Sequence, residues 1–110
     1  PSVQEAARQE PKENEFPADE LPEGQARLVT VAGREVAVYH VNGTFYATQN
    51  ACTHAGGPLS QGKMEGAQII CPWHASCFDV RSGAVECGPA ETPLQTYRVT
   101  LSDGMVRVEI

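Results

Sequence analysis

Two short motifs, each holding one cysteine and one histidine, constrain this chain more than any other feature of its sequence. The first motif is Cys52-Thr-His54 and the second is Cys71-Pro-Trp-His74, with sixteen residues between them. Thiolates and imidazoles are the protein groups that bind soft and borderline transition metals. We therefore predict that the chain folds so that two loops meet at one metal centre.

The donor set leaves three interpretations open. Two thiolates and two imidazoles are the ligands of a [2Fe-2S] cluster in which a pair of histidines replaces a pair of cysteines on one iron. A structural zinc ion accepts the same four groups in a tetrahedron, although a Cys-x-His spacing is unusual for zinc. A disulfide between Cys52 and Cys71 leaves the neighbouring histidines without a purpose. The iron–sulfur interpretation accounts for all four residues and makes the chain an electron carrier.

Length and composition predict one small all-β domain. A chain of 110 residues buries roughly two-thirds of the surface it exposes when unfolded, which supports a single core. Ten Gly, eight Pro and repeated short Val-rich runs are typical of short strands joined by tight turns. We expect residues 1–12 to form a flexible N-terminal tail and residues 13–110 to form the domain.

Turn signals place the expected strands. Asn42-Gly43 predicts a type I′ hairpin, because both residues readily adopt positive φ, and Asp103-Gly104 predicts another near the C-terminus. Residues 52–68 contain four Gly and little periodicity, so we expect a loop there. The expected strands lie near residues 16–21, 28–31, 36–39, 68–71, 78–80, 84–85, 97–101 and 105–110, with a further one that starts at Phe45 and leads toward Cys52.

Charge and hydropathy exclude some partners. The net charge is −6, and five acidic residues without a basic one lie between residues 13 and 23. Nucleic acid is therefore not an expected partner, because its phosphates require a basic surface. The acidic segment serves either docking or solubility. No run approaches the ~18 apolar residues of a membrane span, and no signal peptide is visible, so we expect a cytoplasmic protein with no membrane partner.

The two motifs and their surroundings resemble the Rieske-type ferredoxins, small electron-carrier components of bacterial ring-hydroxylating oxygenases. The resemblance runs from about Phe16 to Ile110. Beyond the four candidate ligands it includes Ala55-Gly-Gly-Pro58-Leu59, Phe78, Gly83, Gly88-Pro89-Ala90 and Pro93-Leu94. It implies a Rieske iron–sulfur fold, with antiparallel sheets and a two-loop tip that binds one [2Fe-2S] cluster.

The resemblance also implies roles for individual residues. Cys52 and Cys71 would bind one iron, while His54 and His74 would bind the other and form the electron exit at the tip. A third loop containing Pro89 would shield the cluster.

Trp73, Ser76 and Pro89 are the candidate residues around the ligands. Ser76 resembles a serine that donates a hydrogen bond toward a bridging sulfide. Trp73 either packs against its loop or contacts a redox partner.

Three departures from related patterns matter. Respiratory Rieske proteins join their two loops by a disulfide, and the corresponding positions here are Gly57 and Trp73. Where the respiratory type has a Tyr hydroxyl, this chain has Phe78, which predicts a potential near the low end of the Rieske range, ~−150 mV. Ala75 replaces a usual Gly, and a positive φ there would add ~1 kcal/mol of strain.

Three residues outside the motifs receive ordinary interpretations. Cys77 and Cys87 are expected to be free thiols, with a role of Cys77 in solvent access or a disulfide between them as alternatives. His40 is expected to be a satisfied strand residue.

The functional expectation is a one-electron carrier that is not an enzyme by itself. Its predicted partners are a flavin-containing reductase that uses NAD(P)H and a terminal oxygenase. An oxygenase centre needs two histidines and a carboxylate, and the chain has only three histidines, two of them assigned to the cluster. The alternative is a Rieske-like small subunit of a cytoplasmic nitrite reductase or another redox complex.

Overall fold

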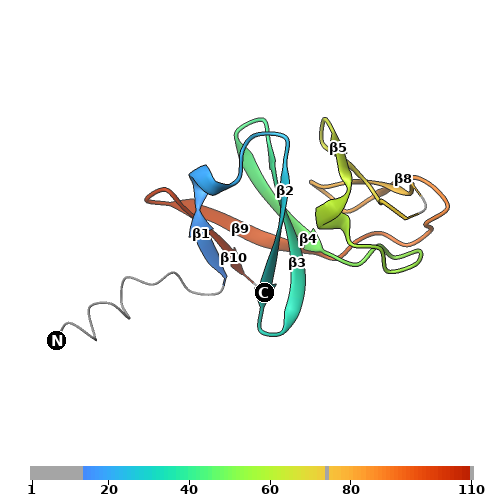
Figure 1. The fold of residues 1–110 in the computed structure, drawn as a ribbon, viewed down its shortest axis with the longest axis horizontal. Coiled ribbons are helices and arrows are strands. Elements are labelled where there is room, and N and C mark those ends of the chain that lie inside the picture. The colour runs from blue at the N-terminus through green and yellow to red at the C-terminus, as the bar shows by residue number, and fades with distance from the viewer. Residues whose placement is uncertain (1–13, 74, 110) are drawn as a thin grey trace.

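The computed structural model describes residues 14–73 and 75–109, so the predicted tail at residues 1–12 lies outside the described residues. Apart from two short 3-10 helices, the regular structure of the described chain consists of short strands, which confirms the all-β prediction (Figure 1). In chain order its elements are β1 (Glu15–Pro17), η1 (Ala18–Glu20), β2 (Ala26–Val31), β3 (Arg34–Val41), β4 (Thr44–Gln49), η2 (Leu59–Gln61), β5 (Lys63–Glu65), β6 (Gln68–Ile70), β7 (Cys77–Asp79), β8 (Val85–Cys87), β9 (Thr96–Ser102) and β10 (Met105–Glu109).

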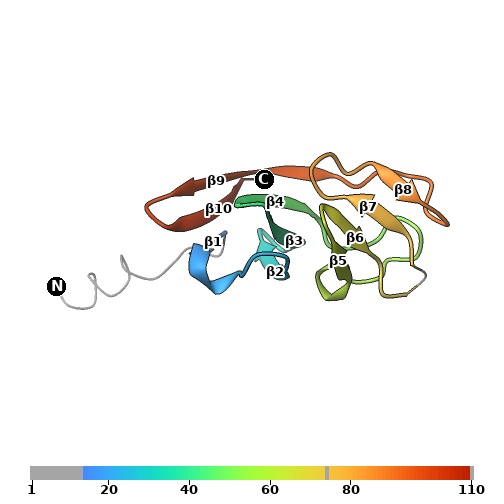
Figure 2. The same ribbon diagram turned by 90° about the horizontal axis from the view of Figure 1, so that it is seen from above.

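These strands form two antiparallel sheets. One has six strands in the order β1-β10-β9-β4-β3-β2, and the other has four in the order β5-β6-β7-β8. Figures 1 and 2 place the four-stranded sheet at one end of the molecule, beyond β4 and away from β1. The long connections after β4, β6 and β8 all lie at this end, so the fold gathers the two motif-bearing segments there.

Tight turns occur where the sequence predicts them. Asn42 and Gly43 have φ values of 52° and 77° between β3 and β4, and Asp103 and Gly104 have 53° and 74° between β9 and β10. Positive φ at both central residues is the requirement of a type I′ hairpin, whose twist matches that of the flanking strands. Local turn chemistry therefore fixes the register of both hairpins.

The buried side chains form two clusters rather than the single core expected from chain length. Side chains alternate between the faces of a strand, and β3 is buried on both faces. Val36 and Val38 belong to the sheet core, which also contains Phe16, Leu21, Val29, Val31, Phe45, Ala47, Val106 and Val108. Ala37, Tyr39 and Val41 belong to the site-side core, which also contains Cys52, Leu59, Ile69, Cys71, Phe78, Val80, Ala90 and Leu94.

The acidic N-terminal segment is engaged with the fold. The Glu15 carboxylate accepts hydrogen bonds from Arg107 on β10, at 2.8 Å from Nε. The Glu20 carboxylate lies 2.8 Å from the Arg27 guanidinium on β2. Glu23 accepts hydrogen bonds from the backbone N–H groups of Asn42 and Gly43. These three carboxylates support β1, β2 and the β3–β4 turn.

The expected loop at residues 52–68 contains more structure than its composition suggests. It includes η2 and β5, and β5 pairs with β6 through the register Met64↔Ile69. No helix among the described residues is long and apolar enough to span a membrane.

Candidate metal centre

The first loop, residues 52–58, folds around the backbone of Cys52. The Cys52 N–H donates to the Gly57 carbonyl at 2.9 Å, and the Cys52 carbonyl accepts from the Gly56 N–H at 2.8 Å. Gly56 has a φ of 79°, in the left-handed region that glycine occupies without steric cost. The Cys52 side chain is buried and His54 is exposed. The loop thus directs a sulfur into the protein and leaves an imidazole in contact with solvent.

The second loop, residues 71–76, begins directly after β6 and repeats this design. The Cys71 N–H donates to the Ser76 carbonyl at 2.8 Å, and the Cys71 carbonyl accepts from the Ala75 N–H at 3.1 Å. Ala75 has a φ of 63°. Its backbone therefore has the positive φ for which the sequence predicts strain at a residue other than glycine. Cys71 is buried. The fourth candidate ligand, His74, lies outside the described residues.

The third loop, residues 88–94, is bound to both of the others through hydroxyl groups. Thr53 Oγ1 donates to the Thr92 carbonyl at 2.6 Å. The Ser76 hydroxyl oxygen accepts from the Ala90 N–H at 3.0 Å, in a fully buried position. A serine hydroxyl that accepts one bond still has its own hydrogen to donate. The predicted role of Ser76 as a donor is therefore compatible with its observed contact.

Cys52 and Cys71 carry free thiols, so they do not form the disulfide considered as an alternative. Burial raises the pKa of the Cys52 thiol, and the adjacent Cys71 thiol raises it further, while the N–H groups of His54 and Ala55 act in the opposite direction. Two neighbouring thiolates repel each other in a buried setting unless a positive centre compensates them. This pair of buried sulfurs therefore fits a metal-containing group that both can bind.

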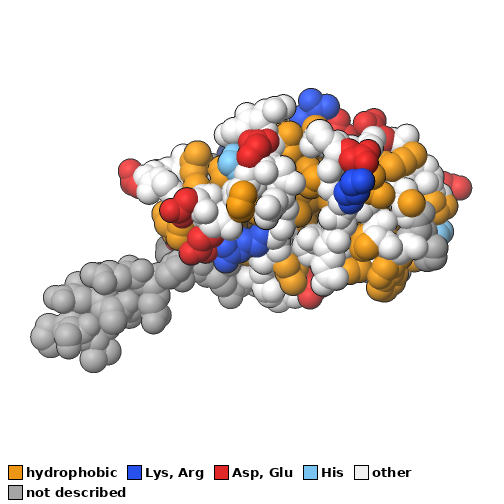
Figure 3. Space-filling view, turned by 45° about the horizontal axis from the view of Figure 1, so that its top comes forward, with side chains coloured by type: hydrophobic (Ala, Val, Ile, Leu, Met, Phe, Trp, Pro, Cys, Tyr) orange, Lys and Arg blue, Asp and Glu red, His pale blue; other side chains and the backbone are white. Residues whose placement is uncertain are grey.

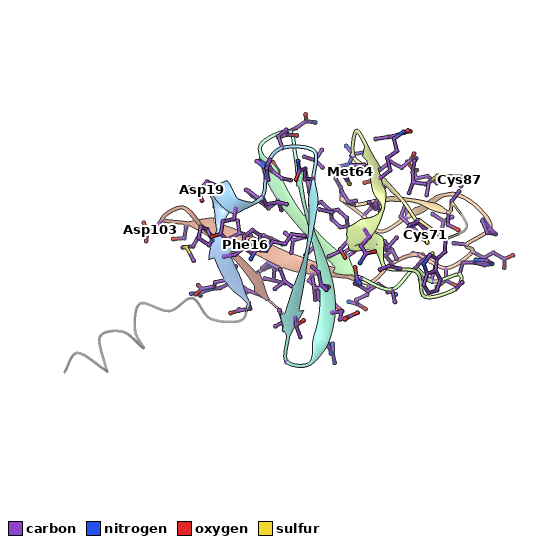
Figure 4. All side chains as sticks on the ribbon, in the orientation of Figure 1. Phe16, Asp19, Met64, Cys71, Cys87 and Asp103 are labelled. Atoms are coloured by element: carbon purple, nitrogen blue, oxygen red, sulfur yellow. A yellow bond between two sulfur atoms is a disulfide. The ribbon has the colours of Figure 1, made fainter. Side chains whose placement is uncertain are left out.

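The structure brings three of the four predicted ligands into two neighbouring loops. Figure 4 labels Cys71 at the end of the molecule that contains the four-stranded sheet, opposite Phe16 and Asp103. Within residues 14–73 and 75–109, no three metal-ligating side chains are close enough together to hold an ion by themselves. The ligand set remains a prediction that requires His74.

The other candidates surrounding the site occupy different environments. Ser76 is fully buried, whereas Trp73 is 57% exposed. Pro89 is exposed and follows a cis peptide bond at Gly88. Thr53 was not singled out in the sequence, and Gly57 was noted only as the position of a missing cysteine. The only available signal for Thr53 was a hydroxyl between two ligands.

The expectation of free thiols at Cys77 and Cys87 is wrong. The two residues face each other across β7 and β8, with their Cα atoms 4.9 Å apart, and form a disulfide. This separation lies within the ordinary range for a cross-strand disulfide. The Arg81–Gly83 turn sets the pairing, since Gly83 N–H donates to the Asp79 carbonyl at 2.7 Å. The bridge lies just after the second loop, and Figure 4 labels Cys87 at the same end as Cys71.

His40 has the ordinary structural role expected of it. Its Nδ1 donates to the Leu21 carbonyl at 2.8 Å, and its ring stacks on Phe45 at a centroid distance of 4.2 Å. It lies in β3, which belongs to the six-stranded sheet rather than to the loops. It is therefore not a further ligand.

Comparison with known families and structures agrees with this geometry. The Rieske [2Fe-2S] domain matches residues 14–98 of the chain. The chain belongs to this family. As a Rieske domain it takes a [2Fe-2S] cluster as its cofactor, and the predicted fold and cofactor are confirmed.

Individual relatives of this Rieske domain are ferredoxins. It is 42% identical over 91 residues to the ferredoxin component of a naphthalene 1,2-dioxygenase system from Pseudomonas aeruginosa, covering 83% of this chain and 88% of that one. The ferredoxin of carbazole 1,9a-dioxygenase from Nocardioides aromaticivorans IC177 has a similar structure, with a TM-score of 0.82 and 33% identity over 84% of this chain and 91% of that one. A chain from a complex of reduced oxygenase and oxidised ferredoxin in carbazole 1,9a-dioxygenase gives a TM-score of 0.81 and 36% identity, with coverage of 84% and 96%.

Proposed function

We propose that Cys52, His54, Cys71 and His74 bind one [2Fe-2S] cluster, and that the protein transfers single electrons from a reductase to the terminal oxygenase of a ring-hydroxylating dioxygenase system. The observation that carries this proposal is the pair of free, buried sulfurs at the starts of two adjacent loops. When bound, the cluster supplies a reversible one-electron couple, whose potential is raised by histidine ligation relative to an all-cysteine centre.

The exposure of His54 supports an electron exit at the tip. His54 is exposed while Cys52, two residues earlier, is buried. If His54 binds the cluster, a redox partner that docks at the tip would meet the imidazole of His54. Figure 3 shows hydrophobic side chains exposed at this end of the molecule as well as over its middle. The exposed Trp73 lies in the second loop, where an oxygenase or reductase would approach.

The relatives supply the partner classes. The relative at 42% identity is the ferredoxin component of a dioxygenase system. The related chain at 36% identity comes from a complex of an oxygenase and a ferredoxin. We infer that the electron donor is a flavin-containing reductase using NAD(P)H and that the protein works in the cytoplasm, where this nicotinamide pool is found. We infer that the protein is a carrier and not an enzyme by itself, since His40, the one histidine outside the proposed ligand set, is bonded to Leu21 and stacked on Phe45.

The test of this function is the cofactor content and the spectrum of the purified protein. We expect iron and acid-labile sulfide in the ratio of a [2Fe-2S] cluster, and an electron paramagnetic resonance signal of the reduced protein with the low average g value of mixed histidine and cysteine ligation. Replacing His54 with Asn should abolish this signal. The matched variant His40→Asn should keep it.

Two outcomes would reject the proposal. One is a protein that binds zinc, contains no sulfide and has no visible absorption after anaerobic reconstitution. The other is a His54→Asn variant with the wild-type signal and potential. Electron transfer itself is measured by reduction of a ring-hydroxylating oxygenase with NADH and a flavin reductase, with and without the protein.

A further inference from the structure

Gly57 lies unusually close to the second loop. A Cβ atom built on Gly57 would be 2.7 Å from the Cys71 sulfur and 3.0 Å and 3.1 Å from the Cγ and Cδ2 atoms of the Trp73 indole. Carbon and sulfur atoms in ordinary contact are separated by more than this. Gly57 does not have the positive φ that its neighbour Gly56 has. The space available, and not the backbone conformation, therefore requires glycine at position 57.

Trp73 makes this contact with a side chain that is otherwise largely in solvent. It is 57% exposed, one of three large hydrophobic residues with this degree of exposure among the described residues. Its indole extends from the second loop to the buried backbone of Gly57 in the first. The same Gly57 carbonyl accepts the Cys52 N–H. The indole therefore lies against the residue whose carbonyl holds the backbone N–H of Cys52.

The thiols of Cys52 and Cys71 lie next to each other, but among the described residues no backbone hydrogen bond runs from one of the two loops to the other. Each loop is closed by its own backbone hydrogen bonds around its cysteine. The third loop binds each of them separately, through Thr53 and Ser76. The contact between Trp73 and Gly57 joins the first loop directly to the second.

We propose that Trp73 is a positioning residue that clamps the first loop onto the second through Gly57, and so fixes the relative placement of the two cysteine sulfurs and covers that of Cys71. The inference rests on the proposed ligand set, because it is the cluster that the clamp retains. Residues that hold metal ligands in place commonly change metal retention by about 10-fold or more when they are replaced.

The geometry also predicts how the clamp can be replaced. One carbon–carbon bond, about 1.5 Å, separates Trp73 Cγ from its Cβ. The Cβ positions of residues 57 and 73 are therefore at most about 4.5 Å apart, within the range that a disulfide spans. A double variant Gly57→Cys/Trp73→Cys should form a covalent link in place of the packing contact.

The experiment measures the rate of iron release to a chelator from the oxidised holoprotein. We expect Trp73→Ala to accelerate release by about 10-fold, Trp73→Phe to have a smaller effect, and Gly57→Ala to accelerate release because the added methyl group displaces the indole. The control Leu101→Ala removes a side chain of similar exposure, 54%, from the far end of β9 and should release iron at the wild-type rate. The oxidised double-cysteine variant should return toward the wild-type rate, and a dithiol reductant should reverse this.

A second readout does not require the cluster. Trp73 is the only tryptophan in the chain, so fluorescence of the apoprotein reports on it alone. Gly57→Ala should shift its emission to longer wavelength, as expected for a displaced and more hydrated indole. This measurement also applies if Trp73→Ala fails to retain a cluster long enough for kinetics.

The outcomes separate the clamp from the function. A wild-type protein without iron and sulfide would reject the ligand set. If the wild-type cluster forms, wild-type rates of iron release in both Trp73→Ala and Gly57→Ala would overturn the clamp. Unchanged apoprotein fluorescence in Gly57→Ala would also overturn it. So would a Trp73→Ala variant whose sole defect is a raised KM for a redox partner.

Discussion

The hydroxyl oxygen of Ser76 accepts a hydrogen bond from the backbone N–H of Ala90 at 3.0 Å, fourteen residues away and fully buried. This bond attaches the third loop to the second at the centre of the site. Its removal would leave the Ala90 N–H without an acceptor in a place that water does not reach. Such a loss costs more than the bond itself contributes.

Replacing Ser76 with Ala is therefore expected to lower the free energy of unfolding by about 1–3 kcal/mol. We also expect a lower midpoint potential, because the hydroxyl hydrogen is no longer available to the reduced cluster. Urea unfolding and redox titration measure the two effects. Ser82→Ala is the matched control, since Ser82 accepts from the Ala84 N–H at 3.2 Å in an exposed turn. Equal losses in both variants would contradict the special role of Ser76.

The disulfide between Cys77 and Cys87 gives a prediction about thiol content. Alkylation of the denatured apoprotein should modify Cys52 and Cys71, and should modify Cys77 and Cys87 only after treatment with a reductant. The double variant Cys77→Ser/Cys87→Ser should lose about 2–3 kcal/mol of stability, as expected for a bridge that closes a short segment. Complete alkylation before reduction would show that the bridge is absent from the purified protein.

The backbone at Ala75 offers a stabilising substitution. Its φ of 63° costs a non-glycine residue about 1–2 kcal/mol, part of which a glycine recovers after its greater unfolded-state entropy is subtracted. Ala75→Gly should therefore raise the unfolding free energy by up to about 1 kcal/mol. Ala55→Gly, at an exposed alanine of the first loop without a positive φ, should lower it. Denaturant midpoints of the two variants should move in opposite directions.

Glu23 contributes to the pH dependence of stability. The backbone N–H groups of Gly43 and Asn42 bind its carboxylate and hold the pKa below the usual value. Because the folded-state pKa is depressed, this stabilisation is present above the pKa of an unfolded glutamate and is lost as the pH falls through the folded-state pKa. Glu23→Gln should be less stable than the wild type at neutral pH. The difference in apoprotein urea midpoints should disappear in strong acid, and a difference independent of pH would contradict this.

Features set by a few adjacent residues were predictable from the sequence. Asn42-Gly43 and Asp103-Gly104 carry their turn conformation in their own φ preferences, and both hairpins form. The positive φ of Ala75 was also predictable, because related proteins usually have a glycine at this position. The motif cysteines lie at the starts of two loops because β4 and β6 end just before them.

Features that depend on distant pairing were not predictable. β5 is a strand because residues 63–65 pair with β6, although the segment 52–68 around them has the glycine content of a loop. The Cys77–Cys87 bridge depends on a strand register that a count of cysteines does not reveal. The requirement for glycine at position 57 comes from a side chain sixteen residues later, so only the folded structure discloses it.

The strand β3 shares its residues between two clusters, with Val36 and Val38 on one face and Ala37 and Tyr39 on the other. The redox end of the molecule therefore loses part of its core when the six-stranded sheet unfolds. Heat that disorders the six-stranded sheet should bleach the protein in the same transition. The visible absorbance of the holoprotein then reports on the folding of the six-stranded sheet as well as on the cluster.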